Sequence, residues 1–214
     1  MKTRLLLWGL LLSVVSELYA QDSPATTFGA WLSMETQSLP IERVQQVDPN
    51  ISTVWSKRAA TGPGGGVFLR WNIVGGWALQ PALGLSTLRH RVFFQGAPPV
   101  DYRFTSLDLP LHIVWTNNSD RFPIRPSVVL GGRVGVNLAR QTARDQLVLL
   151  QEWVAIDLGI GIEIHTKRLI IRPEVLYAYG MNNLHDYTNT SYDPLIGRIQ
   201  RDRLSVRLSC MRVR

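Results

Sequence analysis

The fold of this chain is decided by one run of alternating residues, Val154-Ala155-Ile156-Asp157-Leu158-Gly159-Ile160-Gly161-Ile162-Glu163-Ile164. Every second side chain in the run is a large aliphatic one, and the positions between them hold Ala, Gly, Asp or Glu. A period of two places these two sets on opposite faces of a β-strand, whereas a helix would mix them. The run therefore predicts a strand with one oily face and one small, acidic face.

The same alternation recurs along the chain after residue 26. It appears in seven further stretches, 28–35, 67–73, 77–86, 106–115, 124–138, 171–182 and 203–210. Most of these stretches approach the roughly 9–11 residues that a tilted membrane-spanning strand requires. We therefore expect an all-β protein, an eight-stranded antiparallel transmembrane β-barrel.

The segments between the predicted strands alternate in length. A long loop is expected at 38–61, which leads into Gly62–Gly66, a medium loop at 95–101, and loops at 141–151 and 185–196. Short turns are expected at Gly75-Gly76, 117–122 and 165–168. This alternation is typical of outer-membrane barrels, which have short periplasmic turns and longer outer loops.

The N-terminus has the layout of a cleaved secretory signal peptide. Lys2 and Arg4 precede an apolar stretch, Leu5–Val15, and a small residue, Ala20, ends the segment. The stretch is shorter than the roughly 20 apolar residues of a spanning helix, which argues against the alternative of an anchor helix. We expect residues 1–20 to be removed and residues 21–214 to form one barrel domain. Cys210 is the single cysteine, so no intramolecular disulfide is expected.

The charge of the chain is basic but unusual in kind. The formal net charge is +7, and Lys2, Lys57 and Lys167 are the only lysines among 23 basic residues. Arginine is preferred where guanidinium groups pair with carboxylates in partly buried networks. A nucleic-acid partner would require a basic patch on one face, and here arginines and acids are interleaved. We therefore expect no nucleic-acid partner.

Alternation alone leaves two orientations open, a soluble lipocalin-like barrel with an oily interior and a membrane barrel with an oily exterior. The polar face is rich in glycine, which suits a narrow interior, and the apolar face is too bulky to fit inside. We therefore expect the apolar face to contact outer-membrane lipid. An eight-stranded lumen is just wide enough for side chains to fill, so an open selective channel is the disfavoured alternative. The interior is predicted to hold a structural ionic network of Glu35, Arg70, Asp108, Arg125, Arg133, Asp157, Glu163, Arg172, Glu174, Arg203 and Arg207.

Aromatic residues near the strand ends fit interfacial girdles. Trp77 and Trp115 are expected toward the turns, and Tyr177 and Tyr179 toward the loops.

No catalytic, cofactor or metal site emerges from the sequence. The four histidines are His90, His112, His165 and His185. No Ser–His–acid triad can be assembled from them across the predicted strand order, and no spacing matches a set of metal ligands. Gly62–Gly66 lacks the Lys-Ser/Thr of a phosphate loop. We expect no enzyme activity, no cofactor and no small-molecule substrate.

Three segments carry a family resemblance. Ser106–Ile113 is similar to an "L-x-I/L-P-L" strand of Bacteroidetes outer-membrane barrels, and Ile124-Arg125-Pro126 followed by Gly131-Gly132 looks like their next strand. Arg172–Leu184 resembles the PorT group, whose seventh strand ends in "Y-G-h-N-N-L". The resemblance implies a bacterial outer-membrane barrel associated with type IX protein secretion. The chain departs from many outer-membrane proteins at its C-terminus, Arg212-Val213-Arg214, where those end in Phe or Trp.

Three functions remain open at this point. The first is a non-enzymatic component or accessory of type IX secretion, with other secretion proteins as partners. The second is a stand-alone barrel whose loops 38–61 and 185–196 bind an external ligand or surface. The third, an enzyme acting on lipid or peptide through His90, His112 or His185, has the least support.

Overall fold

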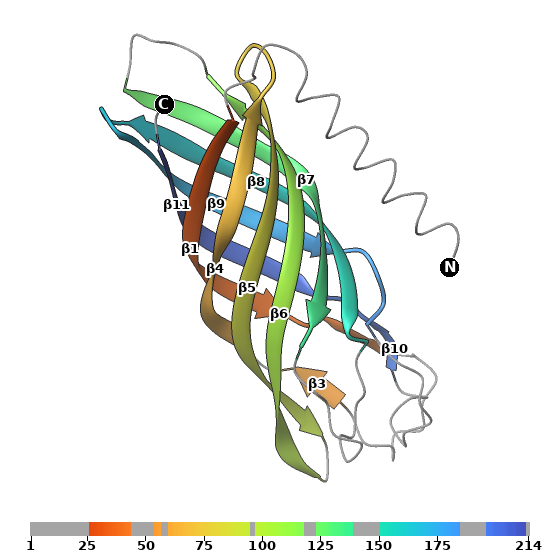
Figure 1. Cartoon of the computed structure of the whole chain (residues 1–214). Coiled ribbons are helices and arrows are strands. Elements are labelled where there is room, and N and C mark those ends of the chain that lie inside the picture. The colour runs from red at the N-terminus through yellow and green to blue at the C-terminus, as the bar shows by residue number, and fades with distance from the viewer. Residues whose placement is uncertain are drawn as a thin grey trace.

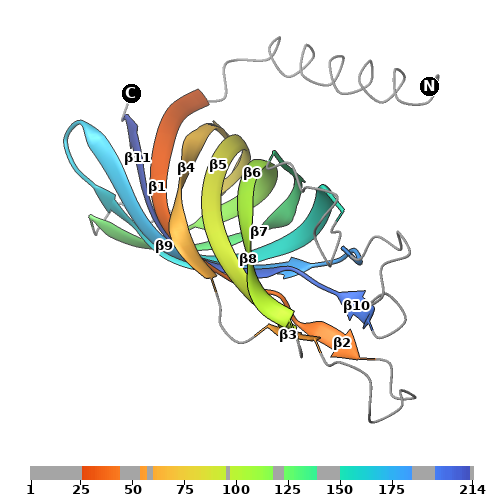
Figure 2. The same ribbon diagram turned by 90° about the horizontal axis from the view of Figure 1, so that it is seen from below.

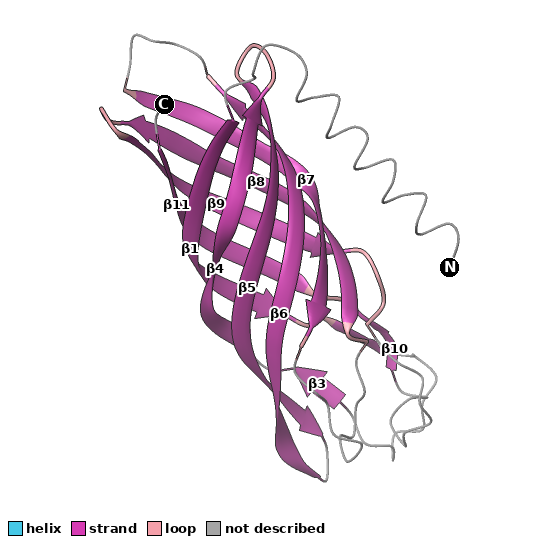
Figure 3. Ribbon diagram, viewed as in Figure 1, coloured by secondary structure: helices cyan, strands magenta, loops and turns pink. Residues whose placement is uncertain are grey.

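The computed structural model describes residues 26–43, 54–56, 60–94, 97–117, 123–138, 150–184 and 196–212. The predicted signal peptide, 1–20, and most of the expected outer loops at 38–61, 141–151 and 185–196 lie outside these ranges. Strands, turns and loops make up the whole of the described part (Figure 3). No helix in the described ranges is long and apolar enough to cross a membrane.

Eight long strands close into a barrel (Figure 1). They are β1 (Thr26–Ser38), β4 (Ala60–Asn72), β5 (Trp77–Phe94), β6 (Ala97–Thr116), β7 (Ile124–Asn137), β8 (Glu152–His165), β9 (Leu169–Gly180) and β11 (Asp202–Arg212). Each strand pairs antiparallel with its neighbours in chain order, and β1 pairs with β11 to complete the ring. Closure satisfies the backbone groups that an open edge would leave unpaired in lipid. The predicted eight-stranded antiparallel barrel is confirmed.

The strands of the barrel present an oily exterior and a polar interior. Leu32 is 75% exposed and Ile160 is 68% exposed, whereas Asp157 and Arg203 are completely buried. The exposed aliphatic set is the one that the alternating pattern assigned to lipid, and in all eight strands it lies opposite the buried set. The lipocalin-like orientation is therefore wrong for this chain.

The predicted strand began at Val67, after the glycine run Gly62–Gly66, and this boundary is wrong. These residues lie within β4, where Gly66 is opposite Trp31 and Gly62 is opposite Glu35 on β1. Glycine has low strand propensity, so the run lacks the alternation that marks the other strands. The Trp31 ring occupies the space beside Gly66, and Ser33 and Glu35 occupy the space beside Gly64, so side chains of β1 fill the room that these glycines leave.

The medium loop expected at 95–101 is also wrong. β5 continues to Phe94 and β6 begins at Ala97, so these two strands form one long hairpin. On β5 the pairing with β4 ends at Ser86, and on β6 the pairing with β7 ends at Ser106. Beyond these residues the hairpin continues past its neighbours, as Figure 1 shows at the lower end of the barrel.

Three short strands were not predicted: two lie within the expected loop 38–61, and the third begins at the last residue of the expected loop 185–196. β2 (Ile41–Arg43) pairs with β10 (Ile196–Ile199), and β3 (Val54–Ser56) pairs with the outer part of β5. Figure 2 shows β2, β3 and β10 gathered at the same end of the barrel. This end is therefore built up well beyond the membrane-spanning wall.

The opposite end of the barrel carries the short turns. Gly75 and Gly76 adopt φ values of 59° and 87°, which glycine reaches without steric cost. At the β8–β9 turn the Thr166 hydroxyl donates to the Leu169 carbonyl at 2.6 Å. Both turns were predicted, and in outer-membrane barrels this end faces the periplasm.

Candidate functional site in the charged barrel interior

One row of ion pairs begins near the periplasmic end of the interior. Arg70 pairs with Glu163, whose Oε1 is 3.5 Å from Nη1 of Arg172. Nε of Arg172 lies 3.0 Å from Oε2 of Glu174, and Oε1 of Glu174 lies 3.6 Å from Nη1 of Arg207. We call these five residues the inner row. Buried charges are tolerable only when they are paired and hydrogen-bonded, and here each has at least one opposite charge beside it.

A second row of ion pairs leads toward the outer end. Nε of Arg133 donates to both carboxylate oxygens of Asp157, at 3.0 and 2.8 Å. Nη1 of Arg133 is 3.9 Å from Asp108, and Nη1 of Arg203 lies 2.6 Å from Asp108 and 2.9 Å from Glu35. We call these five residues the outer row. The two rows together hold ten of the eleven predicted network residues, and their five arginines balance their five acids.

Further polar side chains complete both rows. Nε2 of His112 lies 2.7 Å from Oδ2 of Asp157, and Nη2 of Arg172 donates to Oε1 of Gln80 at 2.9 Å. His112 therefore faces the interior, with Asp157 as its hydrogen-bond partner. Such contacts offset the desolvation of a buried charge.

Trp153 forms the centre of an arginine cluster at the outer end of the interior. The guanidinium carbons of Arg201, Arg203 and Arg133 lie 4.4, 4.6 and 5.9 Å from its ring centroid. The negative face of an indole ring attracts such cations. Trp153 is 1% exposed, so this cluster is sealed from solvent.

A smaller aromatic cluster lies on the β1–β4 side of the interior. Trp31 and Phe68 are in contact, with ring centroids 6.2 Å apart, and Arg207 lies 4.8 Å from the Trp31 centroid. A Cβ on Gly84 would approach Trp31 to 2.9 Å, and a Cβ on Gly66 would come closer still. The glycines therefore make room for an aromatic ring inside a narrow barrel.

Arg201 is a member of the charged interior that sequence analysis missed. Its Nε donates to Oε1 of Gln37 at 2.8 Å and its Nη2 donates to Ser106 at 2.7 Å. It was missed because the predicted strand began at residue 203. The period of two could have revealed it, because residue 201 lies two positions before Arg203 and therefore on the same inward face.

The remaining predicted network residue, Arg125, lies outside both rows. It lines a cavity of about 320 Å³ at the periplasmic mouth, together with Arg70, Glu163 and His165. Its Cα is in register with that of Glu163 on β8. We call this space the periplasmic cavity.

The described residues give little support for a catalytic site. His112 is hydrogen-bonded to Asp157, and Nε2 of His165 lies 3.3 Å from Oε2 of Glu163. No group of three or more His, Cys, Asp and Glu in the described ranges could hold a metal ion. The side chains of His90 and His185 lie outside the described residues.

The "Y-G-h-N-N-L" segment, Tyr179–Leu184, closes the end of β9 at the outer rim. Asn182 accepts a hydrogen bond from the Val154 amide at 2.9 Å and donates to the Glu152 carbonyl at 3.0 Å. Asn183 accepts from the Ile199 amide at 2.9 Å. The two asparagines thus join the ends of β8, β9 and β10.

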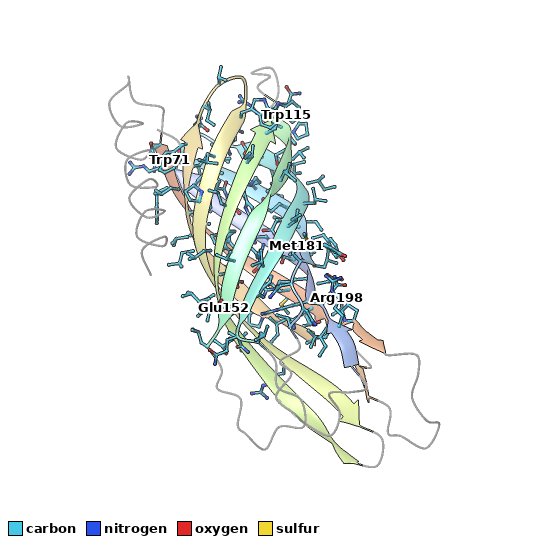
Figure 4. The ribbon with its side chains drawn as sticks, turned by 90° about the vertical axis from the view of Figure 1, so that its right-hand side faces the viewer. Trp71, Trp115, Glu152, Met181 and Arg198 are labelled. Atoms are coloured by element: carbon cyan, nitrogen blue, oxygen red, sulfur yellow. The ribbon has the colours of Figure 1, made fainter. Side chains whose placement is uncertain are left out.

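Side chains on the exterior mark the two ends of the wall (Figure 4). Trp71 and Trp115 lie toward the end with the short turns, whereas Glu152, Met181 and Arg198 lie toward the other end. Trp115 is directly opposite Trp77 in the β5–β6 register. Arg198 donates to the Met181 carbonyl at 3.2 Å.

Comparison with known proteins identifies the class of this chain. A family described as "Outer membrane protein beta-barrel domain" matches residues 20–186, and the chain belongs to that family. A search of curated proteins finds no match.

Among solved structures, the chain is similar to the outer membrane protein OprG from Pseudomonas aeruginosa. The two share 13% identity over 90% of this chain and 97% of that one, with a TM-score of 0.54. Neisserial surface protein A shares 9% identity over 86% of this chain and 96% of that one, with a TM-score of 0.48. The protein is a bacterial outer-membrane β-barrel, and its apolar exterior contacts membrane lipid.

Proposed function

We propose that this protein is a non-enzymatic, stand-alone barrel whose outer rim binds an external ligand or surface. In this proposal residues 1–20 direct export, and residues 21–214 form the mature barrel. The observation that carries it is the contrast between a filled interior and an extended outer end.

The filled interior argues against transport as the main activity. Arg172, Arg203 and Trp153 are among the largest fully buried side chains, and they come from three different strands. The Arg203–Asp108 ion pair joins β11 to β6, and the hydrogen bond from Arg172 to Gln80 joins β9 to β5. These strands are not neighbours in the ring, so a solute could pass only if the contacts between them were broken. We expect the purified protein to give no stable ion conductance in a planar bilayer. A steady single-channel current from the unmodified protein would contradict this expectation.

The outer end offers the surface for binding. The β5–β6 hairpin continues past Ser86 and Ser106, where its pairing with β4 and β7 ends, and β3 pairs with its outer part. The β2–β10 sheet lies at the same end. Regular strands outside the membrane add no lipid contact, which supports a role in recognition.

The test is a pull-down from detergent-solubilised outer membranes. The bait is the full protein, and the matched variant joins Thr87 to Thr105 through an Asn-Gly turn, which removes the projecting hairpin but keeps every barrel strand. We expect partners captured by the full protein to be lost with the variant. Barrel folding of both proteins is checked by heat-dependent gel migration. Equal capture by both would overturn the proposal.

A second candidate function rests on the resemblance of Arg172–Leu184 to the PorT group of Bacteroidetes. It supports a component or accessory of type IX protein secretion, with other secretion proteins as partners. The contacts of Asn182 and Asn183 give the segment a structural role at the rim, which weakens the motif as an argument for secretion. Deleting the gene tests it directly, because fully secreted and processed cargo in the deletion strain would exclude this function.

A further inference from the structure

The charge of the barrel interior is unevenly distributed along its axis. The outer row and Arg201 together hold three arginines and three acids and are neutral. The inner row and Arg125 together hold four arginines and two acids. The excess of two positive charges therefore lies toward the periplasmic mouth.

The acid nearest that mouth is already shared. Oε1 of Glu163 pairs with Arg70, accepts from the Thr116 hydroxyl at 3.1 Å and lies 3.5 Å from Arg172. Its other oxygen lies 3.3 Å from His165. One carboxylate thus serves two guanidinium groups and an imidazole, and the surrounding potential is positive.

The rim around the mouth adds to this potential. Lys167 and Arg168 in the β8–β9 turn and Arg212 at the end of β11 are all exposed. Among the acids whose side chains the structure describes, Glu163 is the one at this end of the barrel. Like charges focused on a concave opening attract and steer an anion.

The walls of the periplasmic cavity are apolar as well as charged. Its polar and charged lining includes Arg70, Arg125, Thr116, Glu163 and His165, and its apolar lining is Ile73, Val74, Trp77, Ile170 and Met211. Its volume of about 320 Å³ is at the lower end of the range for small-molecule pockets. A ligand that fits must be small and must carry an anionic group next to an apolar one.

We propose that the periplasmic cavity binds the free C-terminal carboxylate of a peptide whose last residue is apolar. The planar guanidinium group matches a carboxylate in a two-point contact, and the aliphatic wall takes the last side chain. The site opens to the periplasm, so it goes beyond the recognition proposed for the outer rim.

The test titrates the full-length protein in lipid nanodiscs with two tripeptides. Acetyl-Ala-Ala-Leu carries a free carboxylate, and the same peptide as a C-terminal amide is the matched control. Binding is measured by calorimetry, because seven tryptophans make emission hard to assign. We expect the acid to bind and the amide to bind at least about tenfold more weakly, as a charge-assisted contact predicts.

Two variants, one at an arginine and one at a lysine, distinguish binding in the cavity from nonspecific electrostatic attraction to the positive rim. Arg125→Gln changes the cavity, and Lys167→Gln changes the exposed turn at the same end. We expect Arg125→Gln to weaken binding of the acid by about tenfold or more and Lys167→Gln by less than about twofold. Equal losses in the two variants would overturn the proposal.

Two results on the unmodified protein would also overturn it, so the test does not depend on the folding of a variant. One is equal binding of the acid and the amide. The other is binding of the acid that is lost when the nanodisc contains anionic phospholipid, which would assign the positive rim to lipid headgroups.

Discussion

The guanidinium of Arg201 lies 4.4 Å from the ring centroid of Trp153, and its nitrogens donate hydrogen bonds to Gln37 and Ser106. Because Arg203 and Arg133 approach the same ring, one buried indole supports three cations. We expect Trp153→Ala to lower the free energy of unfolding by about 3–5 kcal/mol, since it removes both packing and cation–π contacts. Urea unfolding in lipid vesicles measures this, and Trp153→Phe should lose less. A change below about 1 kcal/mol for Trp153→Ala would show that the cluster is not important for stability.

The Arg133–Asp157 pair gives a test of the outer row. Asp157→Asn leaves Arg133 without its two-point partner, and we expect a loss of about 3–5 kcal/mol of unfolding free energy. In the double variant Arg133→Gln/Asp157→Asn no charge remains unpaired at this position, so its loss should be smaller than the sum of the two single losses. Additive losses in this double-mutant cycle would mean that the two side chains act independently.

The lipid-facing surface predicts a depth-dependent cost for charge. Leu158 is 54% exposed near the middle of β8, and Glu152 is exposed at the outer end of the same strand. We expect Leu158→Arg to destabilise the folded barrel by about 2–4 kcal/mol and Glu152→Arg by at most about 1 kcal/mol. Both are measured by urea unfolding in vesicles of the same lipid. Equal effects would place Leu158 away from the acyl chains.

The rim contacts of Asn182 predict a modest structural effect. Asn182→Ala removes hydrogen bonds to the Val154 amide and the Glu152 carbonyl, and the expected loss is about 1–2 kcal/mol of unfolding free energy. Asn117→Ala, at an exposed position at the other end, is the control and should change stability by less than about 0.5 kcal/mol. If Asn182→Ala leaves stability unchanged but alters secretion of exported proteins, the segment has a functional role beyond the fold.

The sequence predicted the barrel wall because lipid imposes a strict rule on it. Each strand must expose a large apolar side chain at every second position, and Val154–Ile164 follows this pattern at every position. Gly62–Gly66 was misread because glycine obeys the rule on neither face. Its reason to be in a strand is its pairing with the neighbouring strand β1, whose Trp31 ring lies over Gly66, which sequence spacing alone does not reveal.

The interior could be predicted by type of residue but not by partner. The period of two placed Arg203 and Asp108 on the inward faces of β11 and β6. It could not show that these two residues form an ion pair, because they are 95 positions apart in the chain. Which charges meet depends on strand tilt and stagger across the barrel. The same limit applies to the outer strands β2 and β3, which are too short to show a period of two.

The pairing of β1 with β11 has a consequence for biogenesis. From Gly29–Met211 to Ser38–Asp202, the ring is sealed along one continuous antiparallel junction between its first and last long strands. A product truncated before β11 would present two raw edges, along β1 and β9, to a medium that offers no hydrogen bonds. We therefore expect a chain without β11 not to form a closed barrel in the membrane.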